Sequence, residues 1–414
     1  MIIRSAAQDK IRKDNTVKHK WKFISYFRSG AYGWKGSRLA AKRVKDAVTE
    51  INKVSKTDLA EAATGAVKFM EKIVPAIEHV DDSWGVLGNS IRSAIQAMVE
   101  IVTRAAVDGV LEDAEINKIW NAYTEDGYGY LESIGQYWGQ ICGTQVRAEK
   151  WVNILLPLEK ERLGDEKVSS YSRGTIPLLS CFLACKRYSE LMYYTKSPNL
   201  GMWIYQIFGV KALEEQGKID EAIAYAQECR KELFNAPIFA INEYCEGILL
   251  KAGRYEEAYE RYGLASGDQQ TNLNIYRSIL KKYPMISSER IFNDLVTSCG
   301  PEYKGKWFAT AKSLGKLDLA ISLAQQGPTE PKTLNRAAKE YQEKEPDFAL
   351  KCAMLALRWI SEGYGYEIAG ADVVEARFMA VDIAAKQGKK DEVLAQIREW
   401  SKKNSPFTFL LREV

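Results

Sequence analysis

Apolar residues recur at helical intervals along most of the chain, and this pattern predicts an all-α fold. In residues 37–54, the apolar residues Leu39, Val44, Val48 and Ile51 form a helical pattern. Ser37 stands at the start of this pattern, and a serine at that position can bond the free backbone amides of the first turn. We therefore predict a first helix over residues 37–54, capped by Ser37.

A second helical pattern begins at Thr57, and a third follows the turn at residues 80–88. This turn has the sequence VDDSWGVLG, so Asp and Ser side chains stand just ahead of the third pattern. Such side chains accept hydrogen bonds from the first amides of a helix. The sequence predicts two long helices joined by a turn that caps the second of them.

The middle of the chain is less regular. A short helix is predicted over residues 111–123, followed by an aromatic turn, GYGY, at residues 127–130. Residues 131–163 are predicted to form further helices. Gly135 and Gly139 lie within them, where the missing side chains would let two helices approach closely.

One helical hairpin is written twice in the C-terminal half. Gly217 begins the sequence GKIDEA, and Gly253 begins GRYEEA, 36 residues later. A glycine suits the left-handed position just past a helix end, and the acidic residues favour the start of the next helix. Ala222 and Ala258 fall where the two helices of a hairpin would cross closely.

Weaker versions of this turn recur at intervals of about 29 to 44 residues, which bracket the ~34 residues of a tetratricopeptide hairpin. They begin at Lys186, Tyr283, Gly315, Lys344 and Gly388. We predict tetratricopeptide-like hairpins stacked as a right-handed superhelix of antiparallel helix pairs, because one hairpin cannot bury its apolar face alone.

The pattern divides the chain into four parts. We expect a basic aromatic arm at 1–37, a divergent helical region at 38–170, helical repeats at 171–404 and a tail at 405–414.

Three stretches carry a resemblance to a known family. They are the turn at residues 80–88, TLNRAAK at residues 333–339 and LRWISEGYGYEI at residues 357–368. Together they resemble the helical C-terminal regions of bacterial SWIM-type zinc-finger proteins and their uncharacterised helical-repeat relatives. No Cys-x-Cys pair followed by Cys-x-His occurs, so the zinc finger itself is absent. The resemblance implies a bacterial helical repeat and assigns no site residue.

Positive charge is concentrated near the N-terminus. The chain carries a net charge of +4, with 46% hydrophobic and 27% charged residues, which is typical of a folded chain. Residues 1–46 hold thirteen Lys or Arg against three Asp. The remainder of the chain is therefore acidic overall.

The basic arm also contains six aromatic residues, and two interpretations stay open. Basic groups neutralise phosphates and planar rings stack on bases, so the arm could bind nucleic acid. Its rings could instead dock on the first helices, and we expect the repeats to fold without residues 1–36. The candidate phosphate contacts are Lys10, Arg12, Lys13, Lys18, Lys20, Lys22 and Arg28.

Residues suited to catalysis are sparse. His19 and His79 are the two histidines, and no phosphate-binding glycine loop occurs. Cys181 and Cys185 would share a helix face, and we interpret them as buried packing thiols rather than zinc ligands. The sequence predicts no catalytic residue, no cofactor and no metal.

Seven scattered cysteines and the absence of a long apolar run or signal sequence favour a reduced, cytoplasmic protein without a membrane span. Most tryptophans are expected to fill the core between repeats. The GYGY turns at residues 127–130 and 363–366 are interpreted as links whose tyrosines cover neighbouring hairpins, although a binding loop is the alternative.

These observations favour a non-enzymatic scaffold or adaptor that binds a protein or peptide partner in a multi-component assembly. A nucleic-acid-associated protein that uses the basic arm is the alternative, and a hydrolase ranks third.

Overall fold

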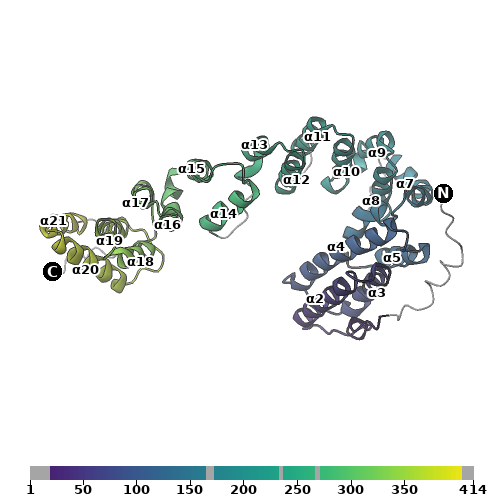
Figure 1. Ribbon diagram of the computed structural model, residues 1–414, viewed down its shortest axis with the longest axis horizontal. Helices are drawn as coiled ribbons and strands as arrows, with labels where there is room; N and C mark the ends of the chain where they lie inside the picture. The colour runs from purple at the N-terminus through teal and green to yellow at the C-terminus, as the bar shows by residue number, and fades with distance from the viewer. Residues whose placement is uncertain (1–18, 165–171, 233–235, 266–270, 403–414) are drawn as a thin grey trace, which may run out of the picture. The chain divides into compact units, whose positions relative to one another are not determined.

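The protein is helical wherever the structure describes it (Figure 1). The computed structural model describes residues 19–164, 172–232, 236–265 and 271–402. Every regular element in these ranges is a helix, which confirms the predicted all-α class. The chain divides into two compact units, Met1–Ile241 (unit 1) and Asn242–Val414 (unit 2).

The N-terminal part of unit 1 matches the helices predicted from the sequence. Its elements are the 3-10 turn η1 (Phe23–Ser25) and the helices α2 (Ser37–Val54), α3 (Leu59–Ile77), α4 (Val86–Val107) and α5 (Asp113–Glu125). α3 starts two residues after Thr57 because Asp58 caps it, accepting a 2.9 Å hydrogen bond from the amide of Glu61. α5 lies two residues later than predicted.

Ser37 does not cap α2, contrary to the prediction. Its hydroxyl donates instead to Asp82 Oδ1 at 3.0 Å. Asp82 also accepts from the amides of Leu87 (2.8 Å) and Gly88 (2.6 Å), so it caps α4 as the sequence predicts for this turn. One carboxylate thereby fastens the start of α2 to the start of α4.

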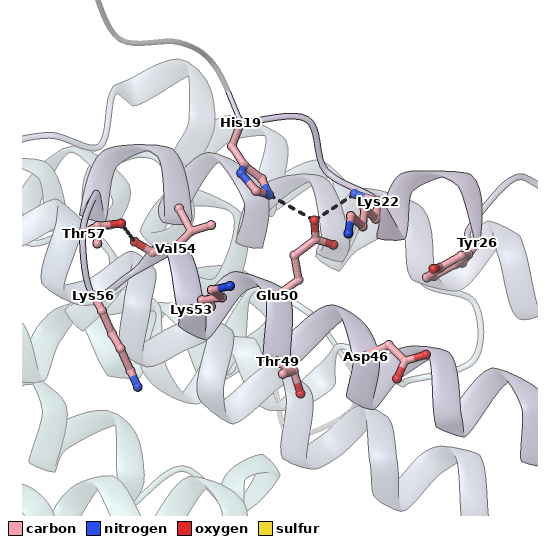
Figure 2. A pocket seen from close by; sticks show the side chains of 10 residues that line it. All are labelled: His19, Lys22, Tyr26, Asp46, Thr49, Glu50, Lys53, Val54, Lys56 and Thr57. Carbon is pink, nitrogen blue, oxygen red and sulfur yellow. Dashed lines mark hydrogen bonds and ion pairs between the residues drawn. The ribbon is translucent and has the colours of Figure 1, made fainter.

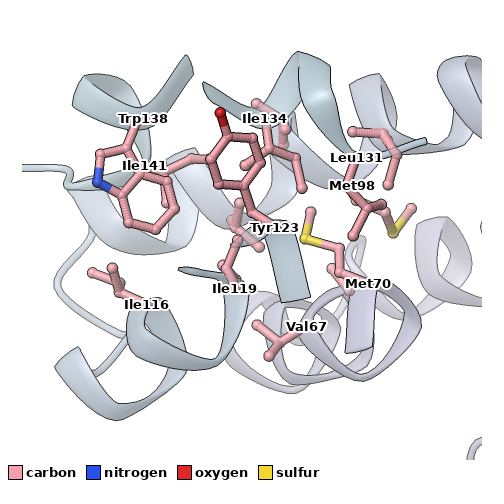
Figure 3. Packing of buried hydrophobic residues seen from close by; sticks show 14 of the residues in the cluster. Val67, Met70, Met98, Ile116, Ile119, Tyr123, Leu131, Ile134, Trp138 and Ile141 are labelled. Carbon is pink, nitrogen blue, oxygen red and sulfur yellow. The ribbon is translucent and has the colours of Figure 1, made fainter. Parts of the chain in front are cut away.

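The rest of unit 1 consists of shorter helices. They are η2 (Glu132–Tyr137), α6 (Trp138–Ile141), α7 (Gln145–Gly164), α8 (Thr175–Ala184), α9 (Tyr188–Thr195), η3 (Pro198–Leu200), α10 (Trp203–Glu215) and α11 (Ile219–Glu232). α6 and α7 both pack against α8, and α10 packs against α11. The core beneath them contains Tyr123 and Trp138 (Figure 3).

The close approach predicted at Gly135 and Gly139 is confirmed. The amide of Gly139 donates to Ser180 Oγ at 3.0 Å, so α6 touches α8 directly. A Cβ atom at Gly139 would lie 2.2 Å from the backbone oxygen of Ser180, and one at Gly135 would lie 2.8 Å from the hydroxyl of Tyr123. No residue larger than glycine fits at Gly139 without moving a helix.

Unit 2 continues with helices of about ten to seventeen residues and a few shorter turns. After α12 (Ile238–Lys251), in whose first turn the unit boundary falls, come α13 (Tyr255–Ala258), η4 (Tyr259–Gly263), α14 (Asn272–Lys282), α15 (Ser288–Ser298), η5 (Pro301–Trp307), α16 (Phe308–Ser313), α17 (Leu317–Gln326), α18 (Pro331–Tyr341), α19 (Pro346–Ser361), α20 (Gly370–Lys386) and α21 (Lys390–Trp400).

Five of the predicted turns share one hydrogen-bonded form. Gly217, Gly253, Gly315 and Gly388 have φ between 69° and 75°, and Lys186 takes the same left-handed conformation with φ of 57°. In each turn the next amide bonds the carbonyl five residues back, which is the Schellman pattern of helix termination. The turns near Tyr283 and Lys344 have no residue in this conformation.

The packing roles predicted for small and aromatic residues hold in part, since Tyr364 and Tyr366 of the second GYGY turn are exposed. Ala222 and Ala258 are fully buried, as expected for close helix crossings. Trp138, Trp307 and Trp359 are also buried. Trp84, however, is 92% exposed. It lies in the turn before α4 rather than on a helix, so no helix face carries it into the core.

Candidate nucleic-acid interface

The structure places three of the seven predicted phosphate contacts. Lys20, Lys22 and Arg28 are exposed on the segment of residues 19–36, which we call the docked segment. Lys10, Arg12, Lys13 and Lys18 lie outside the described residues.

The docked segment is held to unit 1 by its aromatic side chains. Phe23 and Phe27 are buried, and both rings contact Phe69 of α3 at centroid distances of 6.2 and 5.5 Å. Trp21 is buried as well, and its indole donates to Glu61 at 2.9 Å. Its ring occupies the space that a side chain at Gly65 would fill. The docking interpretation therefore holds for this part of the arm.

Backbone hydrogen bonds hold the later part of the segment. The amide of Gly30 donates to the carbonyl of Pro75 at 2.9 Å. Pro75 lies inside α3 and has no N–H to donate to the carbonyl of Glu71, four residues before it. Pro75 and Ala76 stand in the last turn of α3, where backbone carbonyls have no partner within the helix, and Ala76 accepts from the amide of Tyr32 at 3.3 Å.

Glu50 of α2 organises the start of the segment (Figure 2). Its carboxylate accepts hydrogen bonds from the backbone amides of Lys22 (2.9 Å) and Phe23 (3.1 Å), and it lies 3.0 Å from the ring of His19. An open pocket of about 730 Å³ lies beside it, and Lys22, Lys53 and Lys56 are among the residues that line it. The one glutamate in this pocket is therefore already engaged by the protein.

A stripe of cations runs along α2. Arg38, Lys42, Lys45 and Lys53 follow at intervals of four, three and eight residues, which places them on one side of the helix, opposite its buried face. With a rise of 1.5 Å per residue the stripe is about 22 Å long. Sequence reasoning missed it as a site, although its spacing was available in the sequence.

Most of these cations have no carboxylate partner. Residues 19–56 contain ten Lys or Arg against Asp46 and Glu50. Arg43 pairs with Asp46 at 3.4 Å and covers the ring of Tyr26 at 4.0 Å. The other nine are exposed and form no ion pair with any described residue: Lys20, Lys22, Arg28, Lys35, Arg38, Lys42, Lys45, Lys53 and Lys56. We call these nine the cationic face. Its chemistry suits a ligand with several negative charges.

The aromatic turn at residues 127–130 borders a second pocket. Asp126 is buried and accepts from the amides of Tyr128, Gly129 and Leu131, which fixes the turn. Tyr128 is exposed, whereas Tyr130 is half-buried, so only one of the tyrosines covers its neighbours as predicted. Both line a polar pocket of about 530 Å³.

The cysteines near α8 are packing groups. Cys181 and Cys185 are buried, and burial raises the pKa of the Cys185 thiol to about 12. Such a thiol stays protonated at neutral pH and is a poor nucleophile or metal ligand. Among the described residues, no group of three or more His, Cys, Asp or Glu side chains is placed to hold a metal ion.

No protein-family model matches the chain, and a search of characterised proteins finds no similar sequence. None of the helices in the described ranges is both long and apolar enough to cross a membrane.

Proposed function

We propose that the protein is a helical-repeat scaffold, an array of antiparallel hairpins that holds a helix of a partner protein. The five turns with one hydrogen-bonding pattern support a repeated hairpin. Packing of consecutive helices, such as α18 on α19 and α19 on α20, supports stacking. A scaffold of this kind acts through an exposed surface rather than through reacting groups.

A second apolar stripe on α20 carries this proposal. One side of α20 is buried through residues such as Val373 and Ile383. Another side exposes Val374 (57%) and Phe378 (71%), which lie one turn apart. The stripe continues through Ala371, Val381 and Ala385, so its members recur at intervals of three and four residues.

This spacing specifies the occupant. Alternating intervals of three and four residues form the seam along which two helices interlock side chains. A partner helix with the same spacing could cover the stripe over about four turns, because residues 371–385 span about 21 Å. We therefore expect an amphipathic helix from another protein to bind here. Phe378 of α20 should make the main contact with that helix.

Photo-crosslinking tests this proposal. A photoreactive phenylalanine analogue replaces Phe378 in the full chain, and the protein is irradiated in nuclease-treated native lysate. We expect a cross-link to a segment of another protein with apolar residues at helical spacing. Adding Phe378→Glu to a chain with the analogue at Val374 should abolish the cross-link.

The matched control carries the analogue at Tyr303, which is exposed on η5 away from the stripe in sequence. It should give no cross-link to that segment. Cross-links from position 378 to residues 403–414 of the same chain, to a second copy of the protein, or to nothing would each contradict the proposal.

The cationic face supports a second candidate function, the binding of nucleic acid by unit 1. Nine exposed cations without carboxylate partners repel one another, and a phosphate backbone would relieve that repulsion. A triple variant, Arg38→Gln, Lys42→Gln and Lys45→Gln, tests it. Binding of a labelled oligonucleotide should weaken, and the slope of log affinity against log salt should fall by about 2 for a single strand.

The control for this variant removes the same charge from unit 2 through Lys281→Gln, Lys344→Gln and Lys351→Gln, three exposed lysines. Equal losses in the two triple variants would show that only net charge matters. Absence of binding to DNA or RNA at 50 mM salt would exclude this second function.

A further inference from the structure

Two exposed tryptophans stand beside the cationic face. Trp34 is 69% exposed and Trp84 is 92% exposed, whereas large aromatic side chains are usually at least half buried. Trp34 lies near the end of the docked segment, and Trp84 lies in the turn before α4. Neither residue belongs to the core cluster of unit 1.

Hydrogen bonds hold these two loops together. The amide of Asp81, three residues before Trp84, donates to the carbonyl of Trp34 at 3.0 Å. Ser37, three residues after Trp34, donates to Asp82 at 3.0 Å. Two short loops from distant parts of the sequence are therefore fixed side by side, each with an indole ring in solvent.

Cations lie next to Trp34 along the chain, and the hydrogen bonds between the loops bring Trp84 to the same side. Lys35 follows Trp34 directly, and Arg38 opens the stripe on α2. The acidic groups of the Trp84 turn are largely engaged: Asp82 caps α4, and Asp81 accepts from Ser83, which lowers the pKa of Asp81. Asp81 remains charged at neutral pH and would repel phosphates. A sugar-phosphate backbone would therefore lie on the side of the two rings that faces α2.

We propose that Trp34 and Trp84 form a stacking platform for the bases of a single-stranded nucleic acid whose phosphates lie along the stripe on α2. This inference rests on the second candidate function and specifies its ligand. Flat rings in solvent beside a row of cations are how proteins bind single strands without reading sequence. A duplex keeps its bases stacked inside and cannot use the rings.

The surroundings of the rings favour a nucleic acid over an anionic membrane. Insertion into a lipid interface needs a broad apolar face. Here Trp84 follows Asp81, Asp82 and Ser83 in the turn, so the exposed apolar surface that it forms with Val86 is bordered by acidic residues. A base needs only one ring face, so polar neighbours do not prevent stacking.

Fluorescence anisotropy with labelled dT12 and with a 12-base-pair duplex at 50 mM salt tests the platform. Replacement of one ring, Trp84→Ala or Trp34→Ala, should weaken dT12 binding by about tenfold, since one stacked base contributes about 1–3 kcal/mol. Duplex binding should stay within twofold. Trp84→Phe should retain most of the affinity, because a phenyl ring still stacks.

The outcomes separate the platform from the function on which it rests. If the triple variant of α2 weakens binding but both tryptophan variants leave dT12 affinity unchanged, the cationic face binds nucleic acid and the platform is wrong. If no oligonucleotide binds, both are wrong. Binding to vesicles with anionic lipid that is lost in Trp84→Ala, without oligonucleotide binding, would assign the two rings to a membrane surface instead.

Discussion

At the scale of single residues, Lys186 takes a backbone conformation that glycine takes in the equivalent turns. Its φ of 57° places Cβ close to the following carbonyl oxygen, which costs about 1–2 kcal/mol in an L-residue. The side chain is exposed. Nothing in the described contacts of Lys186 compensates for this strain.

Lys186→Gly should therefore raise the free energy of unfolding by about 1 kcal/mol, less the extra flexibility that glycine gives the unfolded chain. Urea denaturation followed by circular dichroism measures the change. Gly217→Ala is the reverse experiment: a Cβ at Gly217 meets nothing within 4 Å, so its cost of about 1 kcal/mol is conformational alone. A destabilised Lys186→Gly variant would contradict this account.

A buried carboxylate in unit 2 depends on one tyrosine. Glu246 is 1% exposed and accepts hydrogen bonds from the hydroxyl of Tyr283 and from Lys282 Nζ (2.6 Å). Burial raises the pKa of Tyr283, and the hydrogen bond to Glu246 raises it further. The folded protein therefore keeps this hydroxyl protonated at pH values where the unfolded chain loses the proton.

Stability should fall with rising pH above about 10, the ordinary pKa of tyrosine, because the unfolded state then binds fewer protons than the folded state. Tyr283→Phe should cost about 2 kcal/mol at pH 7, by loss of a hydrogen bond to a charged group. The same substitution should also reduce the fall in the free energy of unfolding between pH 9.5 and 11.5. Urea denaturation across this range measures both effects, and equal pH slopes in the two proteins would refute the role of Tyr283.

At the scale of helices, the contact between α6 and α8 has no room for a side chain. Because a Cβ at Gly139 would overlap the backbone of Ser180, Gly139→Ala requires one helix to move. We expect a loss of about 3 kcal/mol or more. The free energy of unfolding should fall further in Gly139→Ala than in Gly217→Ala, which adds the same methyl group without a clash. Similar losses in the two variants would disprove the close approach.

At the scale of the whole molecule, the N-terminal segment is part of the core of unit 1. Phe27 is buried against Phe69, and Phe23 contacts both rings. Deletion of residues 1–36 would remove these side chains. We therefore expect it to destabilise unit 1, in contrast to the expectation from sequence that the helices fold without this segment.

A point substitution tests this more cleanly than deletion does. Phe27→Ala in the full chain should lower the free energy of unfolding by about 3–5 kcal/mol, the usual cost of removing a buried phenyl ring. Trp34→Ala, an exposed aromatic in the same segment, should change it by less than about 0.5 kcal/mol. Chemical denaturation of both variants gives the comparison. A Phe27→Ala protein as stable as the parent would mean that the segment is not docked in solution.

The sequence by itself determined the all-α class, the approximate positions of the first helices and five of the turns at which helices end. Apolar spacing located α2 within its observed bounds, because a helix must put one side of its surface into the core. The turn glycines were predictable because a left-handed residue restricts the choice of side chain at that single position. The sequence also predicts the turn at Lys186, because the residues after Lys186 match those after the turn glycines.

The tertiary structure decided which aromatic and charged side chains remain in solvent. Trp21 and Trp34 stand in similar basic and aromatic sequence, yet one is buried on Gly65 and the other is exposed. The exposure of the second stripe of α20 and the lack of carboxylate partners for the cations of α2 likewise depend on which segments lie beside those helices. Local pattern fixes a residue's side of its own helix, whereas exposure depends on what other segments cover that side.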